Sequence, residues 1–260
     1  MTPPTATWAE GRVAFITGAT SGFGKAFAER IVKAGGRVIA TGRREDRLKA
    51  LADAAPEGRC LTRVMDIRDP ASILASLADL PEAFAPIDIL FNNAGLALGL
   101  GKAHEADLAD WDTMIATNVT GLAHVTRAVL PGMVARNRGH LINMSSVAAS
   151  YPYPGGNIYG ATKAFVRQFS LNLRCDLLGT AVKVTSIEPG MAETEFSEVR
   201  FKQDGAAAAK VYADMQPMTA DDIVDVVESV LRLPAHINVN TLEVMPVAQA
   251  FGPFAVARGG

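Results

Sequence analysis

A tyrosine and a lysine lie four positions apart in a segment of helical period, Tyr159 and Lys163. Side chains at positions i and i+4 of a helix emerge from one face, so the phenol and the ammonium can act together. A free tyrosine has a pKa of about 10 and is a poor base at neutral pH, but nearby positive charge favours the phenolate. The pair therefore fits general acid–base catalysis, although such a pair also fits a solvated surface helix.

Three more polar positions point to the same place. Ser146 follows a strand-like segment at residues 139–143, and Asn92 ends another at residues 87–91. Ligands of open parallel sheets bind at the carboxyl ends of the strands. Asn118 lies in the middle of an apolar helical segment, where an amide is mildly unfavourable. Taken singly, these residues also fit a turn serine, a turn asparagine and a hydrogen-bonded core asparagine.

A glycine-rich turn follows the first strand-like segment, residues 13–17, and leads directly into a helix. Gly18 would permit a tight turn, Gly22 would let backbone N–H groups approach a pyrophosphate, and Gly24 would let the helix pack against the sheet. This order of strand, turn and helix is the context that a dinucleotide-binding loop requires. The alternative is a glycine-rich turn without a ligand.

The end of the second strand indicates which dinucleotide would bind. NAD-binding proteins place a carboxylate there, which accepts hydrogen bonds from the ribose 2′-hydroxyl. This chain has Arg43 and Arg44 at that point and no acid at the strand end. Guanidinium groups bind phosphate in a forked geometry, so the sequence favours NADP(H). The alternative is that both arginines solvate the start of a helix.

The elements that must position these residues alternate between strand and helix. Almost wholly apolar strands, each followed by a helix, predict a doubly wound α/β fold with a parallel seven-stranded sheet, a Rossmann fold. The strands are expected at residues 13–17, 38–41, 60–65, 87–91, 139–143, 182–187 and 242–245, and helical stretches at 22–34, 45–55, 70–80, 108–137 and 159–178. We expect a single domain over residues 11–260, after a disordered N-terminal lead at 1–10. Residues 191–217 are polar and alanine-rich, and are interpreted as a substrate lid.

Composition limits the classes of partner. The chain has 260 residues with 25 Lys and Arg against 27 Asp and Glu, a net charge of −2, which argues against nucleic acid. No segment fits a membrane span or a signal peptide. Cys60 and Cys175 lack metal-ligand spacing and are too few for a disulfide framework, so no metal is expected and the predicted location is cytoplasmic.

Taken in their order along the chain, the glycine-rich turn at residues 17–24, the segment 92–95, Asn118, Ser146, the Tyr159 and Lys163 pair, and Pro189-Gly190 resemble the short-chain dehydrogenase/reductase family. The resemblance covers nearly the whole chain. The resemblance implies that Tyr159 is the acid/base, that Lys163 lowers its pKa and binds the nicotinamide ribose, that Ser146 polarises the substrate carbonyl, and that Asn118 anchors a water. It also implies a set of NADP(H) contacts. These are Gly18, Thr20, Ser21, Gly22, Phe23, Gly24, Arg43, Arg44, Asp66, Ile67, Asn92, Ala94, Gly95, Tyr159, Lys163, Pro189, Gly190, Met191 and Thr194.

Residues 39–44, 93–99, 159–170 and 233–242 look like the NADP-dependent 3-hydroxy acid dehydrogenases that oxidise serine and allo-threonine. The resemblance implies a small anionic substrate, bound beside Ser146 and Tyr159. An anion needs a cation, and Arg200 in the predicted lid is the candidate, with Tyr153 expected to line the pocket on the Ser146 side. Arg200 also fits a surface arginine paired with Glu195 or Glu198, and Tyr153 fits plain loop packing. An NADPH-dependent sulfoacetaldehyde reductase is the alternative, and a non-catalytic NADP(H) sensor is the remote one. The resemblance also implies a homotetramer.

Overall fold

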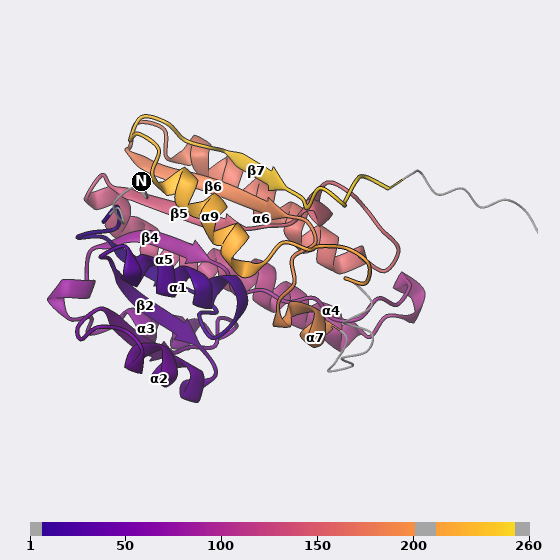
Figure 1. Cartoon of the computed structure of the whole chain (residues 1–260), viewed down its shortest axis with the longest axis horizontal. Coiled ribbons are helices and arrows are strands. Elements are labelled where there is room, and N and C mark those ends of the chain that lie inside the picture. The colour runs from indigo at the N-terminus through magenta and orange to yellow at the C-terminus, as the bar shows by residue number, and fades with distance from the viewer. Residues whose placement is uncertain (1–6, 201–211, 253–260) are drawn as a thin grey trace, which may run out of the picture.

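The computed structural model describes residues 7–200 and 212–252. Its centre is a parallel sheet of seven strands in the order β3-β2-β1-β4-β5-β6-β7 (Figure 1). The chain starts in the middle of the sheet and winds outward in one direction and then the other, with the reversal between β1 and β4. The prediction of a doubly wound seven-stranded Rossmann fold is confirmed, and the reversal places a crevice at the carboxyl ends of the central strands.

Every strand predicted from sequence is present within a few residues of its expected bounds. The strands are β1 (Val13–Ile16), β2 (Arg37–Gly42), β3 (Cys60–Val64), β4 (Ile87–Asn92), β5 (Gly139–Met144), β6 (Val182–Pro189) and β7 (Thr241–Val244). The helices are α1 (Gly22–Lys33), α2 (Glu45–Asp53), α3 (Pro70–Leu77), α4 (Leu108–Ile115), α5 (Leu122–Ala135), α6 (Asn157–Asp176), α7 (Glu195–Arg200) and α9 (Ala220–Leu231).

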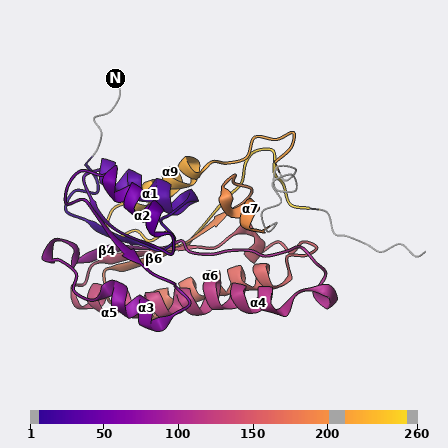
Figure 2. The same ribbon diagram turned by 90° about the horizontal axis from the view of Figure 1, so that it is seen from below.

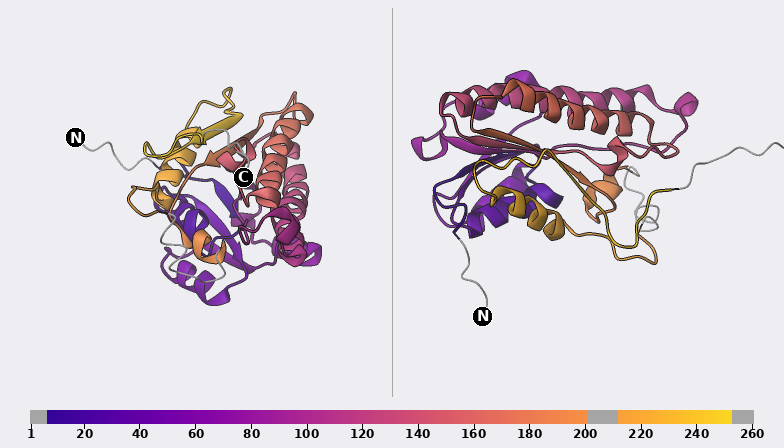
Figure 3. Two further views of the ribbon diagram at one scale, coloured as in Figure 1. Left: turned by 90° about the vertical axis from the view of Figure 1, so that its right-hand side faces the viewer. Right: turned by 90° about the horizontal axis from the view of Figure 1, so that it is seen from above.

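Helices cover both faces of the sheet, which explains why its strands are apolar throughout. Helices α1, α2 and α9 pack on one face, where Phe27, Ile31 and Val227 are fully buried. Helices α3, α5 and α6 pack on the other, around Val125 and Met133 (Figure 2). Figure 3 shows the same three layers from the end and from the opposite side. Strand ends and the loops after them are therefore where polar side chains can serve a ligand without disturbing the core.

The helix predicted over residues 108–137 is interrupted. Residues Ala116–Gly121, between α4 and α5, form a π-helical turn. At Gly121 a Cβ atom would lie 2.6 Å from the Ile67 carbonyl oxygen, so only glycine allows the helix to pass this close to the loop after β3. A π-turn displaces the side chains within it from the regular helical pattern, and it contains Asn118.

The predicted N-terminal boundary at residue 11 was too late. Residues 8–11 form a turn in which the Ala9 side chain is fully buried and its N–H donates to the Ala34 carbonyl at 3.2 Å. The apolar Trp8 and Ala9 close the end of the α1 layer, so this segment belongs to the domain. Residues 1–6 of the lead and 201–211 of the lid lie outside the described residues. Within the described chain, no helix has the length and apolar character needed to cross a membrane.

Candidate active site

The glycine-rich turn between β1 and α1 is built for close backbone approach. Gly18 and Gly22 have φ angles of +68° and +51°, which side chains other than glycine rarely adopt. A Cβ atom at Gly24 would lie 2.3 Å from the Gly18 carbonyl oxygen. Asn93 secures the turn by donating through Nδ2 to the carbonyl oxygens of Thr17 at 3.0 Å and Gly18 at 3.1 Å. The loop therefore presents backbone, and the start of α1, to the crevice.

Arg44 lies over this turn. Its Nε and Nη2 donate to Thr20 Oγ1 at 3.1 and 2.9 Å, and Nη2 also donates to Ser21 Oγ at 2.8 Å. Arg43, the next residue after β2, is exposed and lines the same cavity. Asp66, predicted to contact adenine, accepts from Arg68 at 2.6 Å, and this contact holds the pKa of its carboxyl below the usual range. The cationic end of the crevice thus carries three arginines at the strand ends.

The polar groups beneath the crevice are buried and hydrogen-bonded. Asn118 is 1% exposed, accepts from Leu96 N–H at 2.9 Å and donates to Thr162 Oγ1 at 3.0 Å. Lys163 donates through Nζ to the Met144 carbonyl at 2.9 Å. The π-turn aims Asn118 at α6, and both contacts join the end of a strand or its loop to the helix that carries Tyr159. Burial lowers the pKa of Lys163 to about 8.

Tyr159 and Ser146 line the same cavity, and Ser146 Oγ donates to the Pro189 carbonyl at 3.3 Å. Burial raises the pKa of Tyr159, while the neighbouring Ser146 hydroxyl and the positive charge of Arg200 act in the opposite direction. The Lys163 ammonium lies 5.7 Å from the Tyr159 ring centroid and donates to the Met144 carbonyl, so the lowering of the tyrosine pKa by Lys163 stays a prediction. The phenol is therefore protonated at neutral pH, the form in which its hydroxyl can donate a hydrogen bond.

The chain after β6 closes the crevice from above. We call residues 191–200, the described first part of the lid, the lid arm. Its Phe196 ring lies 5.7 Å from the Tyr159 ring, centroid to centroid. The Arg200 guanidinium lies 5.5 Å from the Tyr159 centroid, and its Nη2 donates to Tyr153 Oη at 2.7 Å. Glu195, the partner weighed for Arg200, instead forms ion pairs with Arg44 and Arg47. The lid arm therefore brings one cation next to the phenol.

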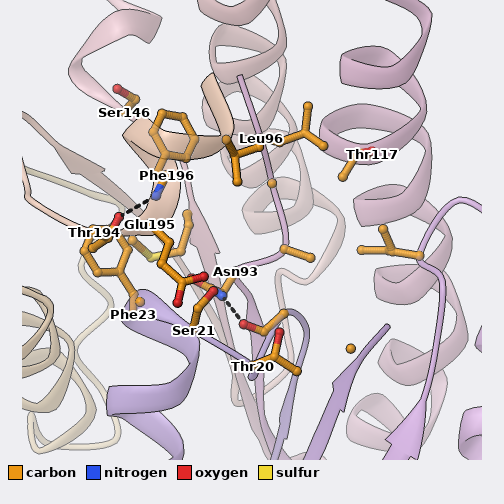
Figure 4. Close-up of a pocket in the computed structure, with 18 of the residues that line it drawn as sticks. Thr20, Ser21, Phe23, Asn93, Leu96, Thr117, Ser146, Thr194, Glu195 and Phe196 are labelled. Atoms are coloured by element: carbon orange, nitrogen blue, oxygen red, sulfur yellow. Dashed lines mark hydrogen bonds between the residues drawn. The ribbon is translucent and has the colours of Figure 1, made fainter. Parts of the chain in front are cut away.

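A cavity of about 350 Å³ runs along the carboxyl edge of the sheet and brings most of the predicted residues together (Figure 4). Those that line it are Gly18, Thr20, Ser21, Gly22, Phe23, Arg43, Arg44, Asp66, Ile67, Ala94, Gly95, Ser146, Tyr159, Lys163, Pro189, Gly190 and Thr194. Gly24 and Asn118 lie directly behind the lining and support it.

Besides Gly24, two predicted cofactor contacts, Asn92 and Met191, do not line the cavity, and neither do the predicted substrate residues Tyr153 and Arg200. The Asn92 side chain is 1% exposed and donates to Thr126 Oγ1 at 2.9 Å and Asn143 Oδ1 at 2.8 Å, so it joins β4 to β5 and α5. The Met191 N–H donates to Gln249 Oε1 at 2.7 Å. Asn92 therefore acts inside the protein, because its strand position directs its side chain into the layer under the sheet.

Sequence reasoning missed several lining residues. Thr117 precedes Asn118, and its buried hydroxyl has no hydrogen-bond partner among the described residues (Figure 4). Asn93 and Arg68 each follow a residue that was predicted. Adjacency to a motif is the signal that could have found all three. Glu195 likewise follows a predicted residue, Thr194, but Phe196 carries no such signal, because only the folded lid arm brings it over the crevice.

These residues fit an NADP cofactor on geometric grounds. A Cβ atom at Gly24 would collide with the Gly18 carbonyl of the phosphate-binding turn, the orphan Thr117 hydroxyl faces the cavity, and the arginines supply charge for a phosphate. The glycine turn would hold the pyrophosphate, Arg43 and Arg44 the 2′-phosphate, and Lys163 and Thr194 the nicotinamide end. No cluster of metal-ligating side chains occurs in the described parts of the chain.

Comparison with known proteins agrees with this arrangement. The sequence profile of the family described as short chain dehydrogenase matches residues 12–205. The chain is 57% identical over 247 residues to an NADP-dependent 3-hydroxy acid dehydrogenase of Salmonella typhi, covering 95% of this chain and 99% of the relative. It is 51% identical over 248 residues to sulfoacetaldehyde reductase 2 of Chromohalobacter salexigens, covering 95% and 98%. A closed form of serine dehydrogenase complexed with NADP+ superimposes with a TM-score of 0.94 at 54% identity, covering 95% and 100%.

Proposed function

We propose a function from the premise that this chain belongs to the short-chain dehydrogenase/reductase family. The protein is an NADP(H)-dependent oxidoreductase acting on the hydroxyl-bearing carbon of a small 3-hydroxy acid such as serine or allo-threonine. The observation that carries this is that the Arg200 guanidinium lies against Tyr159, which lines the same cavity as Ser146, Arg43 and Arg44. Arg200 fits an anionic substrate, and Arg43 and Arg44 fit a 2′-phosphate.

The residues divide the work of the reaction. Bound NADP(H) supplies the hydride acceptor or donor at its nicotinamide ring. Ser146 holds the substrate oxygen by a hydrogen bond. Tyr159 Oη takes the hydroxyl proton during oxidation and returns it to the carbonyl oxygen during reduction. The Lys163 ammonium holds the ribose and adds positive charge beside the phenolate, and Asn118 keeps α6 in register with the loop after β4.

Arg200 is proposed as the anchor for the substrate anion. Its guanidinium packs 5.3 Å from the Tyr153 ring and 5.5 Å from the Tyr159 ring, and its Nε has no hydrogen-bond partner among the described residues. A guanidinium with a free donor beside the reacting phenol suits a carboxylate at the distance of a 3-hydroxy acid. Tyr153 holds the guanidinium in place by accepting from it.

A sulfonate offers the same charge and the same acceptor oxygens as a carboxylate, so sulfoacetaldehyde is the second candidate substrate. The 51% identity to a sulfoacetaldehyde reductase supports keeping it. The test is a panel followed by NADPH absorbance. It compares oxidation of L-serine, allo-threonine and 3-hydroxypropionate by NADP with reduction of sulfoacetaldehyde by NADPH, each repeated with the cofactor that lacks the 2′-phosphate.

We expect the hydroxy acids to have the higher kcat/KM and NADP to be preferred to NAD. A higher kcat/KM for sulfoacetaldehyde would move the assignment to sulfonates. Equal use of NAD would remove the role given to Arg43 and Arg44. Binding of NADPH without turnover of any compound in the panel would favour the non-catalytic sensor.

A homotetramer and a cytoplasmic location complete the proposal. Leu108, Ile115, Val134 and Phe165 leave large apolar groups exposed on α4, α5 and α6, at 69%, 39%, 39% and 36%. Cys60 and Cys175 are free thiols, which suits a reducing compartment. Light scattering after gel filtration should give four times the mass of the 27.4 kDa chain. Fractionation of the native cells should place the activity in the cytosol, and activity in another fraction would overturn that location.

A further inference from the structure

Glu195 joins the lid arm to the cationic end of the crevice. Its Oε2 accepts from Arg44 Nη1 at 3.0 Å, and its Oε1 accepts from Arg47 Nη1 at 2.6 Å. The three side chains are 38–42% exposed, so the bridge lies at the rim of the cavity. Arg44 is itself held by Ser21 of the glycine turn. Each carboxylate oxygen thus has its own guanidinium, and one side chain ties α7 to both α2 and the phosphate loop.

The far end of α7 carries the substrate anchor. Arg200 lies five residues after Glu195, which is a rise of about 7.5 Å along a helix. Its backbone carbonyl accepts from Gly99 N–H at 3.1 Å, and its guanidinium is placed over Tyr153 and Tyr159. Between these ends, the Phe196 ring packs on Tyr159. A single short helix therefore spans from the cofactor arginines to the reacting phenol.

We propose that Glu195 is a positioning residue that couples the occupied 2′-phosphate site to the placement of Arg200 over the substrate. This rests on the proposed function, which gives Arg200 the substrate anion. A phosphate that holds the Arg44 guanidinium also holds Glu195, which is paired with that guanidinium. Through α7, Glu195 then holds Arg200 in place over the substrate. The residue acts on the substrate without touching it.

Charge balance favours this coupling over competition between Glu195 and the phosphate. Arg43, Arg44 and Arg47 carry three positive charges against the single negative charge of Glu195, which leaves 3 − 1 = +2. A phosphate monoester carries a charge of about −1.5 to −2 at pH 7. The cluster therefore accepts a 2′-phosphate while Glu195 stays paired with Arg44 through Nη1 and with Arg47.

The test compares Glu195→Gln with Glu193→Gln, which removes the same charge from an exposed position of the lid arm. At saturating NADP, we expect Glu195→Gln to raise the KM for 3-hydroxypropionate about fivefold, equivalent to ~1 kcal/mol, with kcat nearly unchanged. For the neutral 1,3-propanediol, the KM should stay at the wild-type value, because that substrate makes no use of Arg200. Glu193→Gln should match the wild type with both substrates.

Arg47→Gln provides an independent variant that leaves the residues lining the cavity intact. It should raise the same KM, and the double variant with Glu195→Gln should show less than the product of the two effects. Tighter NADP binding by Glu195→Gln would overturn the proposal in favour of competition, and an equal rise in KM for the neutral diol would assign Glu195 a packing role only. If the wild-type enzyme failed to oxidise 3-hydroxypropionate, the proposed function itself would be at fault.

Discussion

The two sides of the crevice are held in place by different forces. The floor, made of Asn118, Ser146, Tyr159 and Lys163, lies in the π-turn, after β5 and on α6, and three of its four side chains are 9% exposed or less. Its contacts are hydrogen bonds within the folded layers. The lid arm is held by Glu195, Arg44 and Arg47 at the rim, where each side chain is more than a third exposed. Ion pairs of that kind are individually weak and are screened by salt.

This contrast indicates how the two regions divide catalysis. A floor fixed by buried hydrogen bonds keeps its geometry whether or not ligands are bound, so substitutions of its residues should lower kcat. The lid arm, held by exposed ion pairs, can open to admit the cofactor and substrate, so substitutions there should raise KM. The contrast would be wrong if variants of the floor and variants of the lid arm changed the same kinetic parameter, either kcat or KM.

The largest expected effect comes from the floor. Tyr159→Phe removes the proton carrier and leaves the ring that packs against Phe196. We expect kcat to fall about 10³-fold, within the range for loss of general acid–base catalysis. NADPH affinity, measured by fluorescence titration, should change little. Tyr151→Phe is the matched control, since that hydroxyl bonds Glu243 at 3.2 Å outside the cavity. A Tyr159→Phe enzyme with near-normal kcat would refute the assignment.

The substrate anchor should show the opposite pattern. Arg200→Met keeps the aliphatic stem and removes the charge, and we expect kcat/KM for 3-hydroxypropionate to fall about 30-fold through KM. The value for 1,3-propanediol should remain within about twofold of the wild type, as expected for a surface change. Arg232→Met, at the end of α9, makes the same substitution far from the cavity. A parallel fall with both substrates would show that Arg200 shapes the pocket and does not bind the anion.

The pH dependence of oxidation tests the floor by itself. Burial raises the pKa of Tyr159, so only a small fraction is phenolate near neutrality, and that fraction grows with pH. Below the pKa the growth is about tenfold per unit, so kcat/KM for oxidation should rise about tenfold from pH 7 to 8. Lys163, whose pKa is lowered to about 8, then loses its charge, and the profile should bend. Reduction, which uses the protonated phenol, should be level from pH 6 to 8. A kcat/KM for oxidation that stays constant from pH 7 to 8 would contradict the role of Tyr159.

Most of the floor could be predicted from the sequence because its residues are tied to local spacing or to the end of an element. Tyr159 and Lys163 follow helical spacing and Ser146 follows a strand, as Gly18 and Gly24 of the phosphate loop follow another, whereas Asn118 stood out only as an amide within an apolar helical segment. Short-range geometry therefore decides where these side chains lie. The same rule failed at Asn92, because alternation along β4 directs its amide into the protein, and that direction depends on how the strand pairs with β5.

The lid arm could not be predicted in the same way. Its position depends on a salt bridge between Arg44 and Glu195, which are 151 residues apart in the chain. Local spacing pairs Glu195 more naturally with the nearby Arg200, and the sequence left that alternative open. The π-turn at Ala116–Gly121 is a second case, since the close approach of Gly121 to Ile67 is a tertiary contact. Contacts between distant elements decide both features.

The smallest expected effect is the sensitivity of the lid arm to salt. The Debye length falls from about 10 Å at 0.1 M ionic strength to about 3 Å at 1 M, which weakens exposed ion pairs more than buried hydrogen bonds. At saturating NADP, we expect the KM of the wild-type enzyme for 3-hydroxypropionate to rise about threefold between these ionic strengths, with kcat nearly constant. Glu195→Gln has already lost the bridge, so its KM should rise by a smaller factor, which reports direct screening of the substrate anion alone. The difference between the two factors therefore measures the Glu195 bridge. If KM rose by the same factor in the wild type and in Glu195→Gln, the lid arm would be held by packing. The contrast between the floor and the lid arm would then lose its physical basis.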